Sequence, residues 1–125
     1  MKHRLLIIDD DTDLTSLLRG LLSPEHEVVV SENHQGEALR LFRKHKPRLV
    51  LLDLGLKEGS GAQVLQDILR CDATAAVIIL SGNPSLQLAR ETIKMGARDY
   101  VSKPFDLDDL KATIRKHLAA STRAE

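Results

Sequence analysis

The chain has 125 residues with 18 basic and 18 acidic side chains, so its formal net charge is zero. This length suits one domain, and the balanced charge argues against binding of nucleic acid or an anionic membrane. No apolar run is long enough for a membrane span or a signal peptide, so we expect a cytoplasmic protein. The single cysteine, Cys71, excludes an internal disulfide and is expected to fill space at a helix end. The five histidines lack the spacing of metal ligands and are predicted to lie on the surface.

The first apolar stretch, Leu5–Ile8, is predicted to be a strand buried on both faces. It ends on three consecutive acids, Asp9–Asp11. Leucines at helical spacing over residues 14–22 predict a helix next, and Thr12 or Asp13 can cap its amino end. A buried strand therefore delivers carboxylates directly to the start of a helix.

The second predicted strand, residues 27–31, has no acid at its carboxyl end, and its β-branched side chains suit an edge position. A helix is predicted over Gly36–His45, followed by a proline that terminates it. It leads into Leu49–Asp53, where four apolar residues end abruptly on a carboxylate. Asp53 thus lies where a buried strand emerges, and a glycine-rich loop over residues 54–61 follows it.

The rest of the chain repeats the pattern twice. A third helix is predicted around residues 62–69, then a fourth strand over Val77–Leu80 that ends on Ser81. Pro84 and Ser85 are predicted to open a fourth helix that runs through Leu86, Ala89, Ile93 and Met95, and Gly96 closes it at a position that favours the left-handed conformation.

The fifth predicted strand covers residues 97–102 and ends on Lys103. Asp106 is predicted to cap the last helix, which carries an apolar stripe from Leu107 to Leu118. We therefore predict one domain over residues 1–120, with residues 121–125 as a tail or the start of a linker.

The strict alternation of five strands and five helices predicts an α/β fold. We expect a single doubly wound five-stranded parallel sheet with helices on both faces and the flavodoxin-like strand order 2-1-3-4-5. This order places the acid-free second strand at one edge. It also makes the first and third strands neighbours at the crevice where such folds bind ligands.

With that order, the polar residues that end four strands fall on one rim of the sheet. They are Asp9 and Asp10, Asp53, Ser81 and Lys103. Three neighbouring carboxylates repel one another unless a cation neutralises them, and oxygen ligands with room for water suit Mg²⁺. The cation would also let a phosphate approach the acids, so that Asp53 could attack phosphorus and form an acyl phosphate.

Lys103 and Ser81 could then stabilise the charge on the phosphoryl oxygens. Each has a purely structural alternative, because Lys103 can serve only as a counterion and Ser81 only as a turn residue. The convergence of these side chains from separate strands favours a phosphoryl site.

These residues, together with Leu80-Ser81-Gly82, Gly96-Ala97, Tyr100 and Lys103-Pro104-Phe105, resemble the receiver domain of bacterial two-component response regulators. The resemblance covers Arg4 to about Ala120. It implies that Asp53 accepts a phosphoryl group from a sensor histidine kinase or phosphotransfer protein. It further implies that the domain is not an enzyme beyond self-catalysed phosphoryl transfer and autodephosphorylation.

The resemblance also implies the role of each site residue. Asp9, Asp10, Asp53 and the backbone carbonyl of Gly55 would hold Mg²⁺, and Ser81 and Lys103 would contact the phosphoryl group. Tyr100 would be an aromatic switch that turns inward with Ser81, and the peptide bond before Pro104 would be cis.

Phosphorylation is expected to switch a face made of the fourth helix, the fifth strand and the fifth helix. That face is expected to control an output, namely transcription, in another domain or partner, and it could support a homodimer. Charged residues there that could pair between molecules are Arg90, Lys94, Asp99, Lys111 and Arg115. A simply solvated charged face is the alternative.

The chain departs from the family pattern just after Asp53. It has Leu56-Lys57 where the family commonly has methionine and proline, and Gly55 offers no side chain to shield an acyl phosphate from water. A receiver-like interaction module that works without phosphate therefore stays open. So does a haloacid-dehalogenase-like phosphatase, since Asp9–Asp11 supplies paired acids, although Asp13 stands where that family has Thr or Val.

Overall fold

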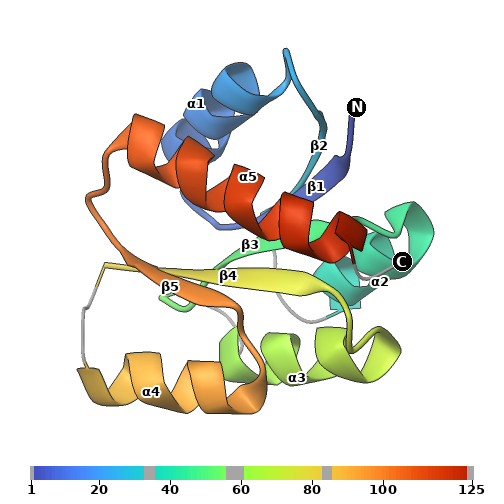
Figure 1. Ribbon diagram of the computed structural model, residues 1–125, viewed down its shortest axis with the longest axis vertical. Coiled ribbons are helices and arrows are strands. Elements are labelled where there is room, and N and C mark those ends of the chain that lie inside the picture. The colour runs from blue at the N-terminus through green and yellow to red at the C-terminus, as the bar shows by residue number, and fades with distance from the viewer. Residues whose placement is uncertain (1, 33–35, 56–60, 83–85, 124–125) are drawn as a thin grey trace.

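Strands and helices alternate strictly along the chain (Figure 1). The computed structural model describes residues 2–32, 36–55, 61–82 and 86–123, with side chains described as far as residue 120. The elements are β1 Arg4–Ile8, α1 Thr12–Leu22, β2 Glu27–Ser31, α2 Gly36–His45, β3 Leu49–Asp53, α3 Gly61–Cys71, β4 Ala76–Ser81, α4 Leu86–Met95, β5 Asp99–Ser102 and α5 Leu107–Arg123.

The five strands form one parallel sheet in the order β2-β1-β3-β4-β5, as predicted. The acid-free β2 lies at one edge and β5 at the other. The register sets Asp53 of β3 beside Leu80 of β4, and Ser81 beside Ser102 of β5. The carboxyl ends of the strands therefore meet at one rim, which is at the left in Figure 1.

The centre of the sheet is buried on both faces, because β3 and β4 contain only buried residues and alternate side chains point to opposite sides. On one face α2, α3 and α4 cover a core, and on the other face α1 and α5 cover a second one (Figure 1). Members of the first core include Leu6, Ile8, Val50, Leu52, Val77 and Ile79, and members of the second include Leu5, Ile7, Leu49, Leu51, Ile78 and Leu80.

The helix ends follow local hydrogen bonding, with one correction. Asp11, rather than Thr12 or Asp13, caps α1, and its Oδ1 accepts from the amide of Leu14 at 3.1 Å. The cause is the position of the first helical residue, which is Thr12 itself. The cap of α5 is Asp106, as predicted, since it accepts from the amides of residues 108 and 109.

The ends of α4 test two further predictions. Gly96 has φ of +118° just after the helix, which confirms the left-handed closure. The predicted helix start at Pro84 and Ser85 lies outside the described residues. The fifth strand begins at Asp99, two residues later than expected.

Several side chains differ from the prediction in whether they are buried or exposed. His26 and His117 are buried, so the prediction that all five histidines are exposed is wrong. Cys71 is exposed at the end of α3 and fills no internal space. Burial of these side chains depends on which neighbouring element packs against them, and the spacing of residues in the sequence does not specify this.

On α4, burial does not follow the apolar residues of the helix. Leu86 and Ile93 are 68% and 45% exposed, whereas Thr92 is buried. The Thr92 hydroxyl donates to the carbonyls of Leu88 and Ala89 at 3.1 Å, so it is satisfied within its own helix. A residue that the apolar pattern passes over therefore faces the sheet.

At the carboxyl end, α5 continues to Arg123, beyond the last residue of the predicted stripe. The assignment of residues 121–125 to a tail or linker stays a prediction. Among the helices of the described segments, none is both long and apolar enough to cross a membrane.

Candidate functional site

The core of the site is a pair of aspartates at the ends of adjacent strands. Asp9 directly follows β1 and Asp53 is the last residue of β3, and both are buried, at 0% and 5% exposure. Half-buried Asp10 joins them, so that carboxylate oxygens of all three lie within 4.8 Å of one another. The structure thus brings together the three acids that were predicted to hold a cation.

Lys103 reaches this group from the far side of β4. Its Nζ lies 2.9 Å from Oδ2 of Asp9 and 3.4 Å from Oδ2 of Asp53. Its backbone amide donates to the carbonyl of Ser81 at 2.7 Å, which ties the segment after β5 to the end of β4. The Lys103–Pro104 peptide bond is cis, as the family resemblance implied. The lysine is therefore held where it bridges two carboxylates.

The charges at the rim perturb one another. Burial raises the pKa of Asp9 above its usual 3.8, and the negative charge of Asp53 adds to this, while hydrogen bonds from the Asp11 amide and Lys103 oppose it. Burial alone would lower the pKa of Lys103, but its hydrogen bond to Asp9 and the charges of Asp9 and Asp53 raise it above its usual 10.5. The lysine stays charged, and three carboxylates face one ammonium.

The carboxylate of Asp53 is oriented at both oxygens. The backbone amide of Gly55 donates to Oδ1 at 3.0 Å, and Oδ2 faces Lys103. A Cβ atom at position 55 would lie 3.5 Å from Oδ1, at ordinary contact distance. The glycine therefore leaves uncovered a position beside the carboxylate where other residues would place a side chain.

Ser81 and Tyr100 connect the rim to the face that carries α4. Ser81 is the buried last residue of β4. Tyr100, on β5 opposite Ile79, packs against the core beneath α3 and α4. Its hydroxyl is buried and has no hydrogen-bond partner within the described ranges. Tyr100 is thus turned inward in this structure.

One contributor to the site was absent from the predictions. The amide of Asp11 donates to Oδ1 of Asp9 at 2.9 Å, while the Asp11 side chain caps α1. Asp11 therefore orients Asp9 without joining the cation cluster. The turn that an aspartate forms with the amide two residues later is the sequence signal that could have indicated this.

Comparisons with known proteins agree with this geometry. The sequence model of the response regulator receiver domain matches residues 5–115. Chemotaxis protein CheY of Bacillus subtilis is 32% identical over 119 residues, which cover 94% of this chain and 99% of CheY. Transcriptional regulatory protein KdpE of Mycobacterium tuberculosis is 38% identical over 93% of this chain, but the chain spans only 53% of KdpE.

Solved structures lead to the same family. The signal receiver domain of a Luxo repressor protein from Vibrio parahaemolyticus superposes with a TM-score of 0.92 at 30% identity, covering 99% of this chain and 95% of that one. A response regulator from Burkholderia pseudomallei, solved with a phosphorylated aspartic acid, calcium ion and citrate, gives 0.81 at 28% identity, covering 89% and 65%. The dehalogenase-like alternative is therefore wrong, and the chain belongs to the response regulator receiver domain family.

Proposed function

We propose that Asp53 is the phosphoacceptor of this receiver domain. The observation that carries the proposal is the position of Asp53, whose Oδ2 lies 3.4 Å from Lys103 Nζ, in a group of three carboxylates. A carboxylate oxygen attacks phosphorus, an O–P bond forms, and the P–N bond of a donor phosphohistidine breaks. The imidazole leaves with the bonding electrons and takes up a proton. The phosphorylated aspartic acid of the Burkholderia relative is a precedent for this product.

The same carboxylates fit Mg²⁺. Hard oxygen ligands from Asp9, Asp10 and Asp53, with the Gly55 carbonyl as the backbone ligand, match its preference for a few carboxylates and several waters. When bound, the ion would neutralise the carboxylates and polarise the phosphoryl oxygens. Asp10→Asn should weaken Mg²⁺ binding at least tenfold by titration calorimetry, and unchanged affinity would contradict this assignment.

Lys103 and Ser81 are assigned to the phosphoryl oxygens. Lys103 already bridges Asp9 and Asp53, so a small movement of its ammonium would exchange a carboxylate for a phosphoryl oxygen. The Ser81 hydroxyl lies at the end of the neighbouring strand β4 and would donate to a second oxygen. Tyr100, on the neighbouring strand β5, would respond when Ser81 moves toward the phosphoryl group.

The test is reaction with acetyl phosphate and, separately, with phosphoramidate, whose P–N bond resembles that of phosphohistidine. With Mg²⁺, wild type should gain the mass of one phosphoryl group, and Asp53→Asn should gain none. Chelation of Mg²⁺ should abolish the gain. An unmodified wild type would instead favour a module that works without phosphate, and a modified Asp53→Asn would place the acceptor elsewhere.

The donor in the cell is proposed to be a sensor histidine kinase or phosphotransfer protein, and the output face to be α4, β5 and α5. Three charged residues proposed to pair between molecules already have internal partners. Asp99 lies 3.0 Å from His117, and Glu25 lies 3.8 and 3.7 Å from Lys111 and Arg115. These contacts reduce the charge that this face offers to a second copy.

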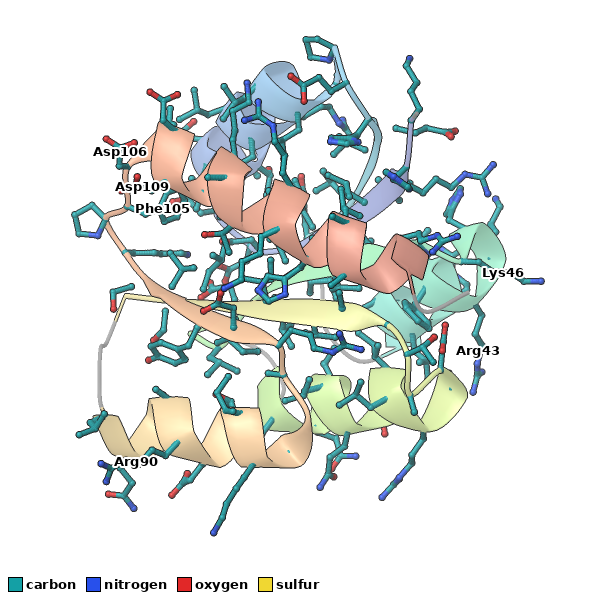
Figure 2. All side chains as sticks on the ribbon, in the orientation of Figure 1. Arg43, Lys46, Arg90, Phe105, Asp106 and Asp109 are labelled. Carbon is teal, nitrogen blue, oxygen red and sulfur yellow. The ribbon has the colours of Figure 1, made fainter. Side chains whose placement is uncertain are left out.

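The outer side of α4 offers the remaining groups. Arg90 and Lys94 make no ion pair with any residue of the described segments, and Leu86 and Ile93 are exposed beside them. Figure 2 shows Arg90 pointing away from the sheet. If this face supports a homodimer, light scattering should report a doubled mass after acetyl phosphate treatment, and Arg90→Glu should prevent it. A monomer under both conditions would contradict the dimer and leave the phosphoacceptor proposal standing.

A further inference from the structure

Gly61, the first residue of α3, packs directly on the backbone that follows the phosphoacceptor. The residue is buried. A Cβ atom built on it would lie 2.9 Å from Cα of Leu54, 2.7 Å from Cδ2 of Leu54 and 3.4 Å from the carbonyl oxygen of Asp53. Contacts below 3.0 Å are not tolerated by real Cβ atoms. A side chain at position 61 would thus meet the end of β3.

The contact with the Leu54 side chain could be relieved by rotation, but the contact with its Cα could not. Leu54 is fixed on its other side, because its amide donates to the carbonyl of Leu80 at 3.1 Å, one residue before Ser81. The preceding residue is Asp53, whose carboxylate is the group that must be placed accurately. A methyl group at position 61 would therefore displace the Asp53–Leu54 backbone.

We propose that Gly61 is a positioning residue for the phosphoacceptor: its missing side chain lets α3 press against the Leu54 backbone and sets where the Asp53 carboxylate stands. The inference rests on the proposed function of Asp53, although the packing itself does not. Gly61 is not among the residues assigned to the phosphoryl group or to the cation, and it acts only through the backbone. Reactions in rigid sites are sensitive to such shifts, since a displacement of about 1 Å can cost about a hundredfold in rate.

The first experiment compares two glycine-to-alanine variants of the whole chain. Gly20, in α1, is exposed and a Cβ there would have no atom within 4 Å, so Gly20→Ala is the matched control. The initial rate of acetyl phosphate modification should fall about tenfold in Gly61→Ala, for a backbone shift of about half an ångström. The rate of Gly20→Ala should equal that of wild type. Equal rates in all three proteins would overturn the proposal.

A loss of stability alone must be separated from a loss of positioning. Ile68→Val removes one methyl group from the buried face of the same helix and should lower the melting temperature without changing the phosphorylation rate of the folded protein. A rate loss in Ile68→Val as large as that in Gly61→Ala would mean that any weakening of α3 slows the reaction, and would overturn the specific role of Gly61.

The backbone route has its own test. Adding Leu54→Ala to Gly61→Ala removes the 2.7 Å contact but leaves the 2.9 Å contact with Cα, so the rate should stay low. Recovery of the wild-type rate would show that the Leu54 side chain, not its backbone, transmits the effect, and would overturn the route proposed.

Amide chemical shifts distinguish failure of this inference from failure of the proposed function. In ¹⁵N spectra, Gly61→Ala should shift the amides of Asp53, Leu54 and Gly55, whereas Gly20→Ala should not. These shifts are expected even if wild type proves not to react with acetyl phosphate. Unshifted amides would overturn the positioning role whatever the outcome for Asp53.

Discussion

The two ends of the parallel sheet treat charge in opposite ways. At the carboxyl rim, Asp9 is fully buried, Asp53 nearly so, and one lysine bridges both. At the amino end, the ion pair of Arg4 and Glu27 joins side chains that are 48% and 63% exposed. Among these described side chains, the two aspartates of the carboxyl rim are removed from water, whereas the ion pair of the amino end is not.

The separation of charge extends beyond the site. Figure 2 shows Asp106 and Asp109 at the end of the molecule that carries the rim, and Arg43 and Lys46 at the opposite end. These four residues place acids near the rim and bases at the opposite end, although the chain as a whole has zero net charge. Buried like charges oppose folding, whereas solvated charges contribute little, so we infer that the rim costs stability for the sake of its chemistry.

Lys103→Met should show the largest difference between the two ends. It leaves the buried carboxylates of Asp9 and Asp53 without their ammonium, and loss of one partner from a buried ion group costs about 3 kcal/mol. Urea unfolding at pH 7 without Mg²⁺ measures this. Lys111→Met is the matched control, because Lys111 faces the half-exposed Glu25 at 3.8 Å and should cost about 0.5 kcal/mol. Equal losses would remove the distinction between buried and solvated charge.

The amino end holds one exception, the buried His26. Burial lowers the pKa of His26 below its usual 6.5, although the charge of Glu25 partly opposes this. Its Nδ1 has no hydrogen-bond partner in the part of the chain that the structure describes. Below pH 6.5 the unfolded state therefore binds more protons at this position than the folded state does. The contribution of neutral His26 to the free energy of unfolding is therefore complete above pH 6.5, and it is lost as the pH falls toward the folded-state pKa.

His26→Leu tests this exception. Relative to the variant, wild type should lose up to about 1.4 kcal/mol of unfolding free energy for each pH unit below 6.5, until the folded-state pKa is reached. Urea unfolding at half-unit steps between pH 7.5 and 5.0 measures the difference. Parallel curves for the two proteins would show that burial at the amino end does not perturb this histidine.

Some features of the fold and of the site could be predicted because they follow from the order of residues along the chain. Strand order and the meeting of Asp9, Asp53 and Lys103 followed from strict alternation and from polar residues at the strand ends, because parallel strands end together. These are properties of the chain pattern alone. They needed no knowledge of side-chain packing.

Features that depend on side-chain packing could not be predicted from the sequence. Burial of His26 depends on its neighbours, among them His3, whose ring centroid lies 6.1 Å away. Thr92 is buried and Ile93 is exposed because of the rotation of α4 about its own axis relative to the sheet, which the sequence pattern does not specify. The contact between Gly61 and Leu54 could not be predicted from the sequence. The spacing of the glycines in this loop does not show which of them lies against Leu54.

Asp10→Asn should give a smaller effect of opposite sign. It removes one negative charge from three carboxylates whose oxygens lie within 4.8 Å, while Asp9 and Asp53 keep their lysine. We expect a gain of about 0.5–1 kcal/mol at pH 7 without Mg²⁺, from relief of like-charge repulsion. The gain should shrink as Mg²⁺ is added to wild type. A loss of stability without Mg²⁺ would show that the rim is not under electrostatic strain.

Glu27→Gln should have the smallest effect. Glu27 accepts from Nε of Arg4 at 3.1 Å, but both side chains are largely in water, and Arg4 keeps a second bond to the carbonyl of His45 at 3.0 Å. The expected loss is at most about 0.5 kcal/mol and should vanish at high salt, where exposed charges are screened. Urea unfolding in low and high salt measures both values. A loss approaching that of Lys103→Met would mean that the stability of the protein also depends on the exposed charges at the amino end. Burial would then not explain the difference between the two ends.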